Sequence, residues 1–122
     1  MNSYFSTEKY KNYTFYRFPK FVITDKRYKN LSSNAKLLYG LILDKAGLSE
    51  KNYKHDKDGR IKVFFTNKQV CNLLNIGHNT VTKIFKELES YDLIDRSKQG
   101  FGQANITYPK LPFVPKEDKY DP

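Results

Sequence analysis

The chain has 122 residues, enough for one domain with one modest hydrophobic core. Hydrophobic residues make up 39% of it and aromatic residues 16%, which excludes an intrinsically disordered chain, while a single cysteine excludes both an internal disulfide and a cysteine-based zinc cluster. The formal net charge of +9 predicts an anionic partner, with nucleic acid first and a lipid surface second.

The N-terminal region is predicted to contribute a β segment. Residues 13–18 are rich in strand formers, Pro19 interrupts the strand, and residues 21–24 can resume it. This region also holds more aromatic rings than one half-covered edge strand needs: Phe5, Tyr10, Tyr13, Phe15, Tyr16 and Phe18. The rings predict either a dimer surface or a completion of the monomer's core beside the first helix.

A first helix is expected from about Asn34 to Ala46. Ser32 or Ser33 precedes it as an N-cap, and apolar side chains then recur at the spacing of one helical face. Gly47 is expected to end this helix. After a polar stretch that closes in an Asp-Gly turn, residues 61–65 are predicted to form a short strand.

Two more helices are predicted in close succession. Thr66 is the expected N-cap of a helix over Asn67–Leu74, and residues 75–77 form a tight turn. The next helix is expected to begin at residue 79 or 80 and to reach about Tyr91. This order is that of a helix-turn-helix, in which one helix braces another that lies in the major groove of DNA.

The C-terminal part is predicted to form a wing and then a linker. Strands are expected over residues 93–97 and 104–108, and two glycines give the turn between them its freedom. Residues 109–122 are rich in proline, which is typical of a linker toward a C-terminal domain outside this sequence or, equally, of a flexible tail. The sequence therefore predicts an α+β fold over residues 1–108: a winged helix-turn-helix with an additional N-terminal β segment.

The last of the three helices is predicted to read DNA. Its apolar residues recur every three or four positions, which leaves short polar side chains and lysines on the other side, the types that bond base edges and phosphates. The expected base-reading residues are His78, Asn79, Thr80, Thr82 and Lys83. The expected contacts to the DNA backbone or from the wing are Thr66, Asn67, Lys68, Lys86, Arg96, Lys98, Gln99 and Gln103. The carboxylates that end this helix are expected to repel DNA, so that only its N-terminal half enters the groove: Glu87, Glu89 and Asp92.

Most of the excess charge lies outside the helix-turn-helix. Residues 66–108 hold five basic and four acidic residues, a net of +1, whereas residues 1–36 hold eight basic and two acidic residues, a net of +6. Four N-terminal cations are therefore candidate phosphate contacts: Lys9, Lys11, Arg17 and Lys20. The alternative is that they only solvate an aromatic-rich segment.

Catalytic, metal and membrane sites find little support in the sequence. It shows no nucleophile elbow, phosphate-binding glycine loop or paired catalytic carboxylates, and two histidines are too few for a metal site. We therefore expect neither an enzyme nor a bound metal or cofactor. The polar N-terminus does not resemble a signal peptide, and no apolar stretch is long enough to span a bilayer, so a cytoplasmic protein with no membrane partner is expected.

Several blocks of the sequence resemble the N-terminal domain of the RepA_N plasmid replication initiators. They are the Arg-Phe-Pro-Lys block at 17–20, the Leu-Ser-x-x-Ala-Lys-Leu-Leu-Tyr block at 31–39, Asn67-Lys68, residues 88–96, and the wing residues 102–108. The resemblance covers about residues 13–113. It implies a dimer that binds repeated sites in a plasmid origin, and a separate C-terminal domain, similar to primosomal DnaD-type modules, that engages host replication proteins.

Two other functions remain open at this point. The same domain can serve a winged-helix transcription regulator, because the sequence does not say which duplex is bound. It can also serve as a protein-interaction module in the replication machinery, and the net charge of only +1 over residues 66–108 leaves room for that.

Overall fold

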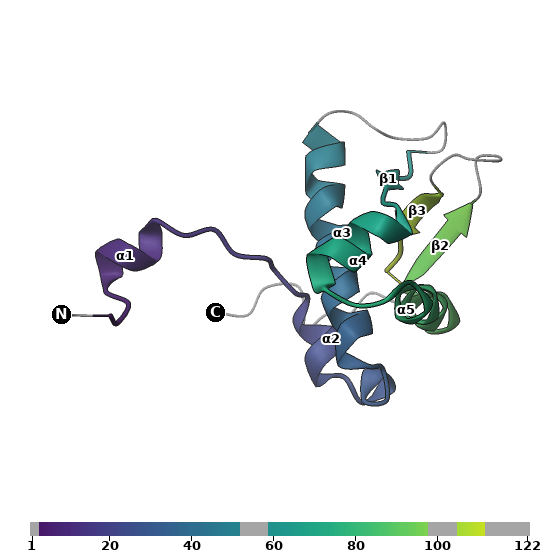
Figure 1. Ribbon diagram of the computed structural model, residues 1–122, viewed down its shortest axis with the longest axis horizontal. Helices are drawn as coiled ribbons and strands as arrows, with labels where there is room; N and C mark the ends of the chain where they lie inside the picture. The colour runs from purple at the N-terminus through teal and green to yellow at the C-terminus, as the bar shows by residue number, and fades with distance from the viewer. Residues whose placement is uncertain (1–2, 52–58, 98–104, 112–122) are drawn as a thin grey trace.

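The computed structural model describes residues 3–51, 59–97 and 105–111 (Figure 1). Six helical segments and three strands follow one another in this part of the chain: α1 (Thr7–Lys11), α2 (Lys20–Thr24), the 3-10 turn η1 (Lys26–Tyr28), α3 (Ser33–Lys51), β1 (Val63–Phe64), α4 (Asn67–Leu74), α5 (His78–Ser90), β2 (Ile94–Ser97) and β3 (Ile106–Pro109). The predicted α+β winged helix-turn-helix is confirmed in its order of elements.

A small antiparallel sheet forms one side of the domain, with β3 between β1 and β2. Thr107 is the central residue of this sheet, because it lies opposite Val63 on one neighbour and Arg96 on the other. Helices α3 and α5 pack against the sheet and against each other, and α4 packs on α5. The core between them is apolar: its fully buried side chains include Leu38, Ile42, Val63, Val70, Phe85, Leu88 and Leu93.

The predicted N-terminal β segment is wrong. Residues 13–19 are extended but pair with no strand in the described part of the chain, and residues 20–24 form α2 instead of a resumed strand. Pro19 precedes the first turn of α2, where its missing N–H is not needed, and Phe21 and Val22 bury their side chains as a helical pair. Strand-forming residues make a strand only when they lie beside a sheet edge, and in the described part of the chain residues 13–18 pair with neither edge strand, β1 or β2.

The N-terminal arm, which we define as residues 3–18, holds α1 away from the body of the domain (Figure 1), while its last residues lie beside α3. Its aromatic side chains do not complete the monomer's core but remain exposed: Tyr4, Phe5, Tyr10, Tyr13, Phe15, Tyr16 and Phe18. Several of them contact each other, with 4.9 Å between the stacked rings of Tyr10 and Phe15 and 5.4 Å between Phe5 and Tyr13. The arm thus carries a small aromatic cluster of its own.

Phe18 fixes the point at which the arm joins the body. Its ring lies so close to the backbone of Gly40 in α3 that a Cβ there would sit 2.3 Å from the ring's Cε1 atom. Glycine therefore lets the ring approach the helix, and the arm ends at this contact.

Two boundaries differ from the prediction. Helix α3 continues through Gly47 to Lys51, because a solvent-facing glycine costs a helix only about 1 kcal/mol and does not by itself end it. Strand β3 includes Pro109, and the next residue, Lys110, donates its backbone N–H to the Leu93 carbonyl at 2.8 Å. Two residues that the sequence assigned to the linker therefore belong to the folded part.

Candidate nucleic-acid interface

The helix-turn-helix forms as predicted. Thr66 and Gln69 make a reciprocal capping box: the Gln69 N–H donates to the Thr66 hydroxyl at 3.0 Å, and the Thr66 N–H donates to the Gln69 side chain at 2.9 Å. Asn75 ends α4 in the left-handed conformation, with φ of 55°, and Gly77 precedes the first turn of α5. The hydroxyl of Thr66, predicted to contact DNA phosphates, accepts a hydrogen bond in the cap of α4, which does not use its O–H donor.

Helix α5 has one buried and one exposed face. Its core face consists of Val81, Ile84, Phe85 and Leu88. The opposite face exposes the imidazole, amide and ammonium groups of His78, Asn79, Lys83 and Lys86. Because side chains of this kind bond base edges and phosphates, the exposed face has the chemistry of a DNA-reading surface.

The two predicted threonine contacts are less accessible than their neighbours. Thr80 and Thr82 are both half-buried. The Thr82 hydroxyl donates to the His78 carbonyl at 3.2 Å and accepts from the side-chain amide of Asn67 at 3.4 Å. Asn67 and Thr82 thus connect the start of α4 with α5, and Lys68 beside them is exposed. The freely exposed candidates for base reading are His78, Asn79 and Lys83.

Glu87 has a role that differs from the predicted one. It was expected to repel DNA, but its carboxylate accepts two hydrogen bonds from Ser32, one from the backbone N–H at 2.9 Å and one from the hydroxyl at 2.7 Å. The Ser32 hydroxyl in turn accepts from the Ala35 N–H at 3.1 Å and so caps α3. No motif in the sequence predicts this contact, because its partners are 55 residues apart.

Asp92 is also engaged. It forms an ion pair with Lys110, and Asp95 lies 3.5 Å from the same ammonium group. The hydrogen bond between Lys110 and Asp92 is the main reason that the pKa of Lys110 is raised. The carboxylates of Glu87 and Asp92 therefore stabilise the domain, whereas Glu89 is exposed near the end of α5.

Arg96 lies at the junction of α5 and the sheet. The centre of its guanidinium is 3.7 Å from the centroid of the Phe85 ring, which forms a cation–π contact. Burial lowers the pKa of Arg96, although an arginine remains charged at neutral pH. The other predicted wing contacts, Lys98, Gln99 and Gln103, lie outside the described residues.

The four predicted N-terminal cations do not join α5. Lys9 and Lys11 are in α1, Arg17 is in the extended part of the arm, and Lys20 begins α2; all four are exposed. In Figure 1 the arm extends on the opposite side of the body from α5. In one domain they therefore form a second basic region that is separate from the helix-turn-helix.

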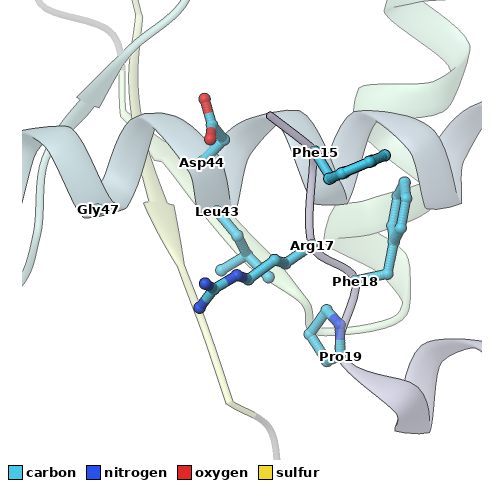
Figure 2. Close-up of a pocket in the computed structure, with 7 residues that line it drawn as sticks. All are labelled: Phe15, Arg17, Phe18, Pro19, Leu43, Asp44 and Gly47. Atoms are coloured by element: carbon cyan, nitrogen blue, oxygen red, sulfur yellow. The ribbon is translucent and has the colours of Figure 1, made fainter. Parts of the chain in front are cut away.

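Beside the arm, a cavity of about 560 Å³ opens between the extended segment and α3 (Figure 2). Its lining residues are Phe15, Arg17, Phe18, Pro19, Leu43, Asp44 and Gly47. Asp44 and Arg17 point in different directions in Figure 2, and the lining has no histidine, cysteine or second carboxylate to serve a reaction. These lining residues do not support the hypothesis of a catalytic site in this cavity.

The described residues contain no cluster of three or more histidine, cysteine, aspartate or glutamate side chains able to hold a metal ion. Within the same part of the chain, no helix combines the length and the apolar character that a membrane crossing requires.

Comparison with known proteins identifies the family. Residues 14–121 match the model of the replication initiator protein A (RepA) N-terminus. The chain belongs to this RepA_N family. The predicted resemblance is thereby confirmed. Among curated relatives, a "41 kDa protein" of Lactobacillus helveticus is 37% identical over 109 residues, which are 88% of this chain and 31% of that protein. The chain thus spans about a third of the length of this relative.

Solved structures agree with this assignment. An "N-Terminal domain of DNA binding protein" is 34% identical, has a TM-score of 0.74, and is matched over 97% of this chain and 90% of its own. A "Structure of Rep-DNA complex" also has 34% identity and a TM-score of 0.74, with coverage of 95% and 89%. A "Structure of MDR initiator" has 34% identity and a TM-score of 0.72, with coverage of 95% and 92%. Each similarity extends over nearly the whole domain.

Proposed function

We propose that this RepA_N domain binds repeated sites in a plasmid origin as double-stranded DNA and thereby initiates plasmid replication. The observation that carries the proposal is the exposed face of α5, where His78, Asn79, Lys83 and Lys86 project from a helix whose other face is anchored in the core. The similarity to a Rep-DNA complex supports the same function. The mechanism is binding and positioning, without a chemical step.

The division of labour among these residues follows from their chemistry. His78, Asn79 and Lys83 are proposed to contact base edges, with Thr80 and Thr82 at the margin of the surface. Asn67, Lys68, Lys86 and Arg96 are proposed to hold phosphates on either side of the groove. We propose that a separate C-terminal domain contacts host replication proteins. We also propose that the protein acts in the cytoplasm.

The first prediction concerns sequence reading. Lys83→Ala is expected to weaken binding to an origin repeat by about 1–3 kcal/mol and to relax specificity, because the loss falls on a base contact. Lys11→Ala, by contrast, is expected to weaken all duplexes about alike if the arm contacts phosphates. Affinities for an origin repeat and a scrambled duplex, measured over a range of salt concentrations, test both statements.

Lys26→Ala provides the matched control, because Lys26 is an exposed lysine of η1. Equal affinity of the wild type for the repeat and the scrambled duplex would refute sequence reading. A footprint on the encoding plasmid separates the remaining alternatives: protection of origin repeats supports replication, and protection of a promoter operator alone supports a transcription regulator. Failure to bind any duplex at low salt would favour a protein-interaction module.

We further propose that two copies of the domain associate through their arms. Two observations support this: the arm's rings are exposed, and none of the backbone groups of residues 14–18 forms a backbone hydrogen bond within the described part of the chain. Unpaired strand formers of this kind are suited to pair with the same segment of a second copy about a two-fold axis. The predicted strand would then form between chains.

The second prediction tests this association. Phe15→Asp is expected to convert a dimer into a monomer, because it places a charge on a ring that is 53% exposed in the single chain. Ile23→Asp is the control: Ile23 is exposed to a similar degree, 58%, but lies on α2 outside the arm. Sedimentation equilibrium measures both. A monomeric wild type, or a dimer that survives Phe15→Asp, would refute pairing through the arm.

A further inference from the structure

Arg96 is held in an unusual way. It lies in β2, one position before the last residue of that strand, and its side chain turns back over α5. The ring beneath it belongs to Phe85, which is 1% exposed and therefore fixed by the core. The guanidinium, 3.7 Å above the ring centroid, rests on a surface that the fold does not allow to move.

Among the described residues, none forms a hydrogen bond with the buried Nε atom of this guanidinium. Within this part of the chain, Arg96 also forms no salt bridge. The residue opposite it in β3, Thr107, is fully buried, and its Oγ1 atom also has no partner. Buried polar groups nearly always have a hydrogen-bond partner, so two neighbouring groups without one indicate that the fold accepts an energetic cost at this position.

Stacking leaves the donors of an arginine available. A guanidinium stacks through its flat face, whereas its N–H groups point outward in the plane of the group. The ring of Phe85 therefore fixes the orientation of the group without competing for its donors, and no described carboxylate bonds to it; Glu89 acts on it only through its charge. Because the Nε atom is buried, an oxyanion would bind the terminal amino groups of the guanidinium, whose orientation the stacked ring already fixes.

The position of Arg96 indicates which oxyanion this is. An α-helix with its side chains is about 10–12 Å across and fills a major groove about 12 Å wide, so a residue on the flank of the helix meets the groove's phosphate wall. Arg96 lies beside α5 and not on its exposed face, because it reaches from β2 over Phe85, a residue of the helix's core face.

We propose that Phe85 is a positioning residue whose ring orients Arg96 to bind a DNA phosphate at the root of the wing. This inference rests on the proposed DNA binding and deepens it, because it assigns to a buried phenylalanine a part in phosphate recognition. Phe85 itself does not touch DNA. Its effect reaches the duplex only through Arg96.

The test measures how binding of the 122-residue chain to a random-sequence duplex of about two helical turns depends on salt. A random duplex suffices because a phosphate contact is blind to sequence. Arg96→Met keeps an apolar stem over Phe85 but removes the charge, and it is expected to lower the slope of log K against log salt by about 0.9. Phe85→Leu keeps a buried apolar side chain but removes the ring, and it is expected to weaken binding by about threefold to tenfold.

The double variant separates positioning from support of the fold. If the ring acts through Arg96, Phe85→Leu should have almost no further effect on DNA binding when Met already replaces Arg96. Ile84→Val is the control, because it trims a neighbouring buried side chain of α5 and should leave the salt slope unchanged. Thermal unfolding confirms that every variant is folded at the assay temperature.

The outcomes are distinct. An unchanged salt slope in Arg96→Met would overturn the phosphate contact, and equal effects of Phe85→Leu in both backgrounds would overturn the positioning role, while DNA binding itself would stand. A wild type that binds no duplex would overturn the proposed function together with this inference. The expected result is a reduced salt slope in Arg96→Met and no further loss of DNA binding when Phe85→Leu is added to that variant.

Discussion

Replacement of Glu87 by alanine is expected to destabilise the domain by about 2–3 kcal/mol. From its residue type alone, Glu87 would be taken for a solvent-exposed side chain. Its carboxylate accepts both the backbone N–H and the hydroxyl of Ser32, at 2.9 and 2.7 Å, in a half-buried position. Alanine removes two charge-assisted hydrogen bonds and leaves the Ser32 N–H without this acceptor. Because Ser32 caps α3, the substitution also loosens the connection between the two longest helices.

Two comparison variants make this result specific. Glu87→Gln keeps one acceptor oxygen and should lose about half as much stability. Glu89→Ala, two residues further along α5 and exposed, should change the free energy of unfolding by no more than about 0.5 kcal/mol. Urea unfolding monitored by circular dichroism compares all three. Equal stabilities of the Glu87→Ala and Glu89→Ala proteins would mean that the bonds to Ser32 contribute nothing measurable.

The elements that the sequence predicted well are those specified by neighbouring residues. Thr66 and Gln69 cap α4 from three positions apart, and Asn75 turns the chain immediately after it. The apolar positions of α5 recur within one helix, so its buried face follows from spacing alone. Local chemistry and tertiary packing agree on the bounds and the buried faces of these two helices.

The elements that were mispredicted depend on contacts between distant residues. Residues 13–18 have strand propensity, but whether a strand forms depends on pairing with a sheet edge, and this segment pairs with neither β1 nor β2 in the described part of the chain. The bond between Ser32 and Glu87, and the stacking of Arg96 on Phe85, each join residues whose proximity arises only once the chain has folded. A sequence pattern therefore marks the exposed face of α5 but not the interactions that hold and orient its surroundings.

The candidate site shows the same distinction. Exposure of Asn79 and Lys83 follows directly from helical spacing, and the structure agrees. The accessibility of Thr82 does not, because its hydroxyl is engaged by Asn67 of α4 and by the His78 carbonyl. Which polar side chains remain free to meet DNA is decided by the neighbouring helix as much as by the reading helix itself.

Leu88→Ala is expected to have the largest effect on stability of the substitutions considered, a loss of about 2–5 kcal/mol. Leu88 has no exposed surface and lies on the core face of α5. Removing its side-chain carbons leaves a cavity at the point where α5 meets the rest of the core. In a domain of this size such a loss is a large fraction of the total stability, so part of the population should be unfolded at moderate temperature.

Lys86→Ala is the matched variant on the opposite face of the same helix, two residues earlier. Its side chain is exposed, so the free energy of unfolding should change by no more than about 0.5 kcal/mol, while affinity for DNA falls with a shallower salt dependence. Thermal unfolding and DNA titration of both proteins form one experiment with two readouts. If α5 is a reading helix anchored from behind, Leu88→Ala lowers the melting temperature and Lys86→Ala does not, whereas any folded fraction of Leu88→Ala still binds DNA with the wild-type salt slope. The reverse pattern would mean that the polar face of α5 packs against the protein and the assignment of the two faces is mistaken.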